Sequence, residues 1–163
     1  MTSQDDPVAE ATDKVLHRRA ELAAPVREVF DHFTRPELLC KWLCATAHVD
    51  RETGGRYELF WVPDDPENNS TIGCRVTAWA PGELLAFHWR SPAQFKAFAN
   101  VADPLTHVVV SFAPTERGCR VHLVHSGWRR TPEWEEARQW QARAWSVAFE
   151  QLEALWPLTG STR

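Results

Sequence analysis

The stretch TPEWEEARQWQARAWSVAFEQLEALW, residues 131–156, has the pattern of one long helix that begins near Pro132 and ends near Trp156. Thr131 is a suitable N-cap, a proline is tolerated at the first helical position, and the glutamates that follow favour the positive end of the helix dipole. Apolar residues recur at three- and four-residue steps, namely Trp134, Ala137, Ala144, Trp145, Ala148, Phe149, Leu152 and Leu155. Because alanine dominates the middle of this arc, the helix either packs closely on a sheet or covers a cavity.

Alternating runs before this helix predict antiparallel strands at 56–62, 71–80, 83–89, 106–113 and 120–126, with a weaker strand at 47–51. In the last of these strands, alternation places His125 on the inner face with Leu123 and places His122 on the outer face. The two histidines therefore cannot bind one metal ion together.

The N-terminal part adds one strand and two short helices. The strand is expected at 14–22, where Val15 and His17 alternate with charged residues. A first helix starts at Pro25, and a second short helix covers 37–43. In this order the elements describe an α+β design, in which a curved antiparallel sheet wraps around the long C-terminal helix and buries its apolar stripe.

Composition and charge restrict the classes of function. The 163 residues suit one domain, expected at 14–157, with a disordered N-terminal tail at 1–13 and a C-terminal tail at 158–163. A formal net charge of −4 argues against nucleic acid as a partner. No apolar run approaches the ~18 residues of a transmembrane helix, and the polar N-terminus does not resemble a signal peptide. We therefore expect a cytoplasmic protein without membrane insertion.

Nine tryptophans in one small domain imply either a bulky core or an aromatic-lined cavity. The inward positions of the predicted strands, together with the long helix, give a candidate wall for an apolar ligand pocket. Its residues are Trp42, Tyr57, Leu59, Trp61, Phe87, Trp89, Val108, Val110, Phe112, Leu123, His125, Trp145 and Phe149. Side-chain directions decide whether this wall encloses space or only packs.

Short motifs spread along the chain resemble those of the AHSA1-like family, named after an activator of the Hsp90 ATPase, in the helix-grip (START and Bet v 1-like) superfamily. The motifs run from the first helix to the last, in the family's order and spacing. They are 24–30, 34–38 with Trp42, Asp50 with Gly54 and Gly55, Gly73, Val76, Pro81, Leu84, Trp89, Gly118, 123–128, Trp145 and Leu152.

This resemblance implies a helix-grip fold with a cavity between the sheet and the C-terminal helix. Members of the superfamily bind lipids, sterols or polyketides, some are cyclases or dehydratases, and one is a co-chaperone of Hsp90. The first expectation is therefore the binding of a small hydrophobic molecule without a cofactor. The alternatives are an enzyme of the cyclase or dehydratase type and a module that contacts a chaperone or regulator. A homodimer is also compatible with the sequence.

Catalysis has little support in the residues, and no catalytic residue is assigned. The nucleophile, phosphate-loop and His-Glu-x-x-His motifs are all missing from the sequence. An enzyme would need two polar groups that converge inside the pocket, and His125 with Tyr57 is the pair to consider.

Two further features leave alternatives open. Cys40, Cys44 and His48 are spaced four and four, so they would share one face of a helix and could hold a metal ion; small buried thiols are the preferred interpretation, and no metal is predicted. The segment 90–105 is long for a link between strands. It is either a short amphipathic helix that covers the cavity mouth as a lid or an irregular surface loop.

Overall fold

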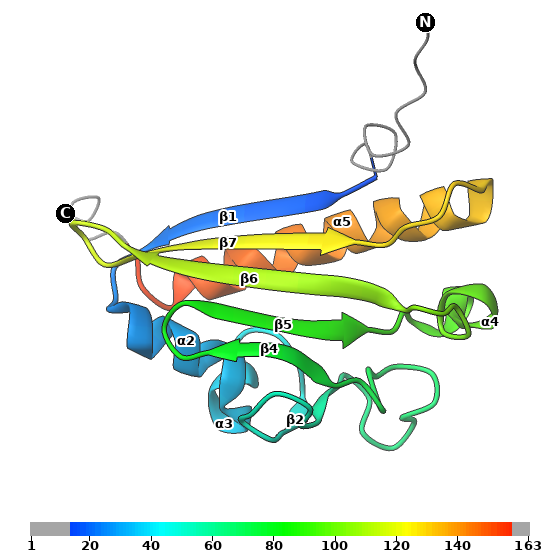
Figure 1. Ribbon diagram of the computed structural model, residues 1–163, viewed down its shortest axis with the longest axis horizontal. Coiled ribbons are helices and arrows are strands. Elements are labelled where there is room, and N and C mark those ends of the chain that lie inside the picture. Colours follow the sequence, from blue (N-terminus) through cyan, green and yellow to red (C-terminus); the bar gives the residue numbers. More distant parts are fainter. Residues whose placement is uncertain (1–13, 158–163) are drawn as a thin grey trace, which may run out of the picture.

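The computed structural model describes residues 14–157, in which a five-stranded antiparallel sheet is crossed by one long helix (Figure 1). The strand order is β1-β7-β6-β5-β4. The strands are β1 (Leu16–Leu22), β4 (Val76–Ala80), β5 (Leu84–Trp89), β6 (Thr106–Pro114) and β7 (Cys119–Ser126). A second sheet pairs β2 (Thr46–Val49) with β3 (Tyr57–Phe60). The α+β helix-grip prediction is confirmed.

The helices lie on one side of the large sheet (Figure 1). They are α2 (Val26–Thr34), α3 (Pro36–Leu39), the 3-10 turn η1 (Ala93–Phe95), α4 (Lys96–Ala99) and α5 (Pro132–Ala154). Thr131 caps α5 as predicted, since its Oγ1 accepts the backbone N–H of Trp134 at 3.3 Å. No helix in the described part of the chain combines the length and apolarity that crossing a bilayer requires.

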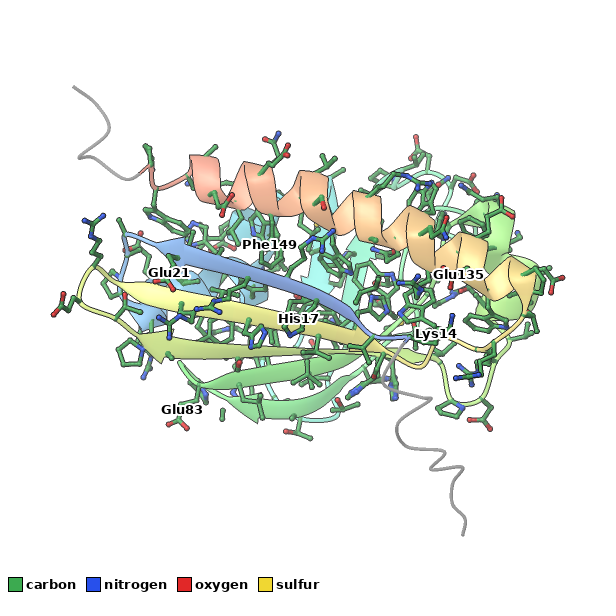
Figure 2. All side chains as sticks on the ribbon, turned by 90° about the horizontal axis from the view of Figure 1, so that it is seen from above. Lys14, His17, Glu21, Glu83, Glu135 and Phe149 are labelled. Atoms are coloured by element: carbon green, nitrogen blue, oxygen red, sulfur yellow. The ribbon has the colours of Figure 1, made fainter. Side chains whose placement is uncertain are left out.

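The core lies between the sheet and α5, because strand alternation sends one apolar row toward the helix. In β6, Val108 and Val110 are buried, and in β7 Val121 and Leu123 are fully buried beside them. Figure 2 shows Phe149 in the space between α5 and the sheet. The predicted inner face of these two strands is therefore the observed one.

The row of Val15 and His17, expected to alternate with charged residues in the first strand, is not the buried row. Leu16, Ala20 and Leu22 face the core, whereas His17 is exposed and its Nε2 lies 2.6 Å from Nε2 of His122 on the outer face. The register of β1 against β7 sets this alternation, because Leu16 pairs with His125 and both point inward.

Two predicted boundaries differ from the structure by four residues or more. The second short helix ends at Leu39 instead of residue 43, although Trp42 is still buried in the turn that follows. The predicted strand 71–80 begins at Val76, because Gly73 takes a positive φ of 87° in a turn before it.

In α5, Trp145 is buried as expected. One turn before it on the same side of the helix, a polar residue, Gln141, is also buried.

Tyr57 links β3 to the helical layer. Its ring is fully buried and stacks on Phe87, with the centroids 3.9 Å apart, and its hydroxyl donates to the carbonyl of Phe33 at 2.6 Å. Burial raises the pKa of this hydroxyl well above its usual value.

Replacing Tyr57 with phenylalanine is expected to lower the free energy of unfolding by about 1–2 kcal/mol, because a buried carbonyl loses its partner while the stacking remains. Urea unfolding at pH 7.5 measures the change. Tyr57→Leu, which removes the stacked ring as well, should cost more. A Tyr57→Phe variant as stable as the parent protein would contradict the hydrogen bond.

Candidate functional site

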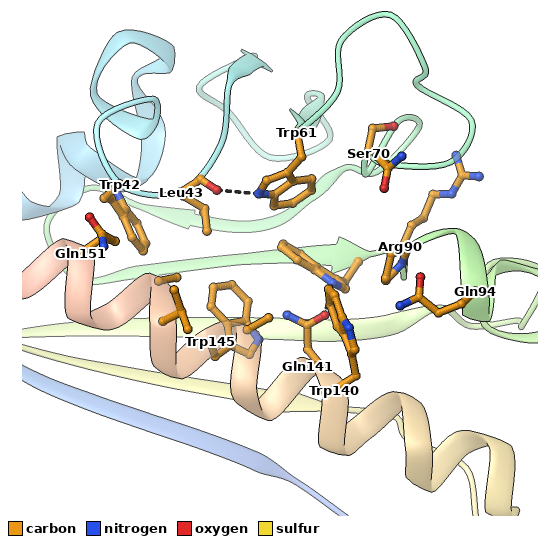
Figure 3. A pocket seen from close by; sticks show the side chains of 16 residues that line it. Trp42, Leu43, Trp61, Ser70, Arg90, Gln94, Trp140, Gln141, Trp145 and Gln151 are labelled. Carbon is orange, nitrogen blue, oxygen red and sulfur yellow. Dashed lines mark hydrogen bonds between the residues drawn. The ribbon is translucent and has the colours of Figure 1, made fainter.

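A cavity of about 650 Å³ lies between the inner face of α5 and the segment that joins β3 to β4, near the end of β5 (Figure 3). Five tryptophans line it: Trp42, Trp61, Trp89, Trp140 and Trp145. The other lining residues are Leu43, Asn69, Ser70, Arg90, Pro92, Gln94, Gln141, Ala144, Val147, Ala148 and Gln151. The mouth is open to solvent, since Trp61 and Val147 are 38% and 58% exposed.

The alanines of α5 explain why space remains under this helix. Ala137 is buried in the core, so close packing holds at that end of the helix. Ala144 and Ala148 lie about two and three turns further along the same side and line the cavity. A small side chain between two bulky neighbours leaves a gap unless another side chain fills it. The helix therefore packs closely on the sheet near Ala137 and covers a cavity near Ala144 and Ala148.

Hydrogen bonds to the protein fix the orientation of four of the five indoles. Trp42 and Trp61 donate their Nε1–H to the carbonyls of His32 at 2.9 Å and Leu43 at 2.6 Å. Trp89 donates to the side-chain oxygen of Gln141 at 3.2 Å. The N–H groups of these indoles are therefore already satisfied, and their apolar ring surfaces remain to form the wall.

His125, which is buried behind the cavity wall, orients the fourth indole, that of Trp145. Trp145 Nε1 donates to His125 Nδ1 at 3.0 Å, so this ring nitrogen carries no proton. The proton is therefore on Nε2, which lies 3.0 Å from Oγ1 of Thr106. Burial is the main cause that lowers the pKa of His125 to about 3, and His107 lowers it further. The ring is neutral at neutral pH and positions Trp145.

Several polar side chains of the cavity, including its one charged group, gather at one end. Figure 3 shows Ser70, Arg90 and Gln94 on one side of the cavity, across from Trp42 and Gln151. Arg90 Nη1 donates to the carbonyl of Ile72 at 2.8 Å, whereas its buried Nε has no hydrogen-bond partner in residues 14–157. The opposite side is lined mainly by apolar side chains, with the amide of Gln151 among them.

Comparison with known proteins places this fold and cavity in a family. A family model described as "Activator of Hsp90 ATPase homolog 1-like protein" matches residues 23–156. The chain belongs to the activator of Hsp90 ATPase homolog 1-like family. This confirms the resemblance found in the sequence motifs. The comparison with curated proteins gave no match.

Solved structures share the fold of this family member. Protein MLL2253 from Mesorhizobium loti is 21% identical with a TM-score of 0.69, and the match covers 86% of this chain and 95% of that one. The Aha1 dimer from Colwellia psychrerythraea is 16% identical with a TM-score of 0.64, covering 85% and 92%. DynU16, a putative protein in the dynemicin biosynthetic locus, is 17% identical with a TM-score of 0.64, covering 87% and 46%. At these identities the likeness shows the fold alone.

The structure places the predicted pocket residues of this family member in two groups. Four of them line the cavity: Trp42, Trp61, Trp89 and Trp145. The rest are buried behind the wall and do not line the cavity, namely Tyr57, Leu59, Phe87, Val108, Val110, Phe112, Leu123, His125 and Phe149.

The pair considered for catalysis is not formed. The Tyr57 hydroxyl is bonded to Phe33, and both ring nitrogens of His125 are bonded to Trp145 and Thr106. Neither side chain lines the cavity. Their polar atoms stabilise the core and orient the wall.

Several lining residues were not found from the sequence. Gln141 lies on the same stripe of α5 as Ala137 and Trp145, and a polar residue on an apolar stripe was the available signal. Arg90 follows the last residue of β5, where strand alternation no longer predicts direction. Trp140 lies outside the predicted arc and gave no signal beyond its residue type.

The cysteines and histidine spaced four and four are distributed over three local structures. Cys40 is the exposed C-cap of α3, Cys44 follows the turn that ends at residue 43, and His48 is on β2 with its Nδ1 3.7 Å from Oε1 of Glu58. Burial raises the pKa of the Cys44 thiol to about 12. Because α3 ends at Leu39, the three side chains do not share a helix face. Residues 14–157 contain no group of three or more metal-binding side chains with suitable geometry.

The segment after β5 forms a short helical cover at the polar end of the cavity. η1 and α4 agree with the short-helix alternative for this segment. The rings of Phe95 and Phe98 pack on Trp140 and Trp134 of α5, with centroids 6.1 and 5.2 Å apart. Asn100 closes the segment through hydrogen bonds to both backbone groups of Ser91. Pro92 and Gln94 of this segment line the cavity, and its movement as a lid stays a prediction.

Proposed function

We propose that this protein binds one small hydrophobic molecule in the cavity under α5. The observation that carries the proposal is a space of about 650 Å³ with five tryptophans in its wall. Ligand pockets usually span about 300–1,000 Å³ and are lined mainly by apolar and aromatic side chains with a few polar groups. The cavity fits this description in both size and chemistry.

Water is a poor occupant of the apolar part of this space. The indole N–H groups of Trp42, Trp61 and Trp145 are satisfied by the protein, so these side chains offer water only ring surface. A ligand gains roughly 25 cal/mol for each Å² of apolar surface that it removes from water. Part of this gain offsets the entropy lost on association. A lipid-like or polyketide-like molecule therefore suits the site better than a small polar metabolite.

A role as a module that contacts a chaperone or regulator is the second candidate. Such a role needs an exposed apolar surface. Among the large hydrophobic side chains of residues 14–157, the exposed ones are Trp61, Val62, Val101 and Val147. Two of these, Trp61 and Val147, also line the cavity. A protein partner that used this patch would therefore compete with a ligand at the same mouth.

The direct test is a titration with N-phenyl-1-naphthylamine, a neutral hydrophobic fluorophore. We expect saturable enhancement of the probe at a stoichiometry of one, together with quenching of tryptophan emission, because the probe would lie against several indoles. Decanol should displace it competitively. A folded sample with non-saturable binding, or with several equivalent sites, would overturn the proposal and direct attention to the exposed patch.

A further inference from the structure

We propose that the hydrophobic ligand carries an anionic head group, of the carboxylate type, which binds Arg90 at the polar end of the cavity. This inference rests on the proposed function and names the chemical class of its ligand. It predicts a ligand with a long apolar body and one acidic end.

The cavity has one charged side chain. Its lining contains tryptophans, aliphatic residues, amides and one serine, and Arg90 is the only ionisable residue among them. The protein as a whole has a formal net charge of −4, so general attraction does not favour an anion. A preference for an acidic ligand must therefore come from this local cation.

Arg90 has no ion-pair partner within residues 14–157. Glu58, a carboxylate of β3, is occupied elsewhere, because its Oε2 accepts the backbone N–H of Gly73 at 2.9 Å and its Oε1 faces His48. The guanidinium charge is thus left to solvent or to a ligand. An uncompensated cation in the wall of a cavity favours an anion there.

The geometry of the guanidinium shows which edge is available. Nη1 is held by the carbonyl of Ile72 at 2.8 Å. Nε, which is shielded from solvent, has no partner among the described residues. The remaining edge presents the N–H groups of Nε and Nη2 side by side, which is the fork that matches the two oxygens of a carboxylate. For this edge to reach a ligand in the cavity, the flexible side chain has to rotate.

Neighbouring amides extend the same polar end. The side chains of Gln94 and Asn69 also line the cavity, and the amide of Gln141 uses its oxygen to accept from Trp89. The Gln141 nitrogen is therefore left as a donor. Donors from three elements, the β3–β4 segment, η1 and α5, thus line the cavity that would hold the head group. The acidic end and the apolar body of the ligand are then separated along the length of the cavity.

The test uses two ligands that differ only at the head group. Dodecanoic acid and dodecanol, both below their aggregation limits, displace N-phenyl-1-naphthylamine from the wild-type protein at pH 7.5. We expect the acid to bind at least about 10-fold more tightly than the alcohol, as charge-assisted hydrogen bonds to a carboxylate require. Arg90→Gln should remove this preference and leave the affinities of the alcohol and of the naphthylamine within about twofold. Arg90→Lys should restore part of it, because the charge returns without the fork.

The matched control is Arg143→Gln, which removes a charge from an exposed position of α5 that does not line the cavity. This variant should keep the preference for the acid. Equal affinities for acid and alcohol in the wild-type protein would overturn the anionic head group and leave hydrophobic binding intact. A preference that persists in Arg90→Gln would overturn the role of Arg90. Failure of the naphthylamine itself to bind would instead overturn the proposed function.

Discussion

Replacing Ala144 with tryptophan is expected to weaken binding of N-phenyl-1-naphthylamine by about 100-fold or more, with little loss of stability. Ala144 lies on the helix wall of the cavity and is only half-buried, so a larger side chain can enter the cavity without displacing the core. An indole at this position occupies the space that the ligand would use. A loss of 100-fold corresponds to about 2.7 kcal/mol of binding free energy. Fluorescence titration measures the affinity, and urea unfolding measures the stability.

The neighbouring residue supplies the control for this experiment. Arg143 is exposed and does not line the cavity, so Arg143→Trp adds the same ring to the same turn of α5 outside the site. It should bind the probe as the wild-type protein does. An Ala144→Trp variant that binds with unchanged affinity would show that the probe lies elsewhere, and the cavity would then lose its role as the binding site.

Acidification is expected to lower the free energy of unfolding already at pH values well above those at which carboxylates titrate. The folded state holds His125 neutral, with a pKa of about 3, whereas an unfolded histidine titrates near 6.5. Between these values the unfolded state binds more protons, so stability rises with pH. The contribution of His125 is therefore complete above about pH 6.5 and falls by up to about 1.4 kcal/mol for each pH unit below it. Between pH 6.5 and 4.5 this amounts to about 2–3 kcal/mol.

Urea unfolding at several pH values between 7.5 and 4.5 checks this slope. Desolvation also lowers the pKa of His107 and of His122, so both contribute in the same direction. The salt-bridged carboxylates of Asp50 and Glu135 have pKa values of about 2 and lose their contribution mainly below pH 4.5.

The variant His125→Gln isolates the effect. It should be less stable at pH 7.5 by about 2–4 kcal/mol, since it disturbs a buried network with Trp145 and Thr106, and its pH slope should be shallower than that of the wild type. His122→Gln, on the outer face, should retain most of the slope. Parallel pH profiles for the wild type and His125→Gln would contradict the assignment.

Strand alternation and helix periodicity were sufficient to predict the fold, because each element buries one face. In β1 the buried row differs from the expected one, and this difference has a physical cause. In β1 the inward row is Leu16, Arg18, Ala20 and Leu22, and a charged residue interrupts the apolar pattern. The guanidinium of Arg18 reaches α5, where it donates to the carbonyl of Ala142 at 2.7 Å. The long side chain of Arg18 thus gives its guanidinium a hydrogen-bond partner, although the sequence pattern predicts a solvent-exposed residue at this position.

The candidate site was only partly predictable, because alternation gives the face of a residue and not its distance from a cavity. Val108 and Val110 lie on the predicted face but are buried under other side chains, whereas Trp89 on the same face reaches the cavity. The polar end depends on Arg90 and Gln94, which belong to a segment without strand alternation. Only the path of the chain after β5 brings them to the tryptophans.

The row of indoles in the cavity wall also has a consequence for spectroscopy. The ring of Trp89 lies 5.8 Å from that of Trp61 and 5.1 Å from that of Trp145, measured between centroids. At such separations excitation energy migrates from ring to ring before it is emitted, and neighbouring transitions couple in near-ultraviolet circular dichroism. Light absorbed by any of the three rings would then be emitted largely from the one of lowest excited-state energy. A single occupant of the cavity would therefore change the emission of the whole row at once.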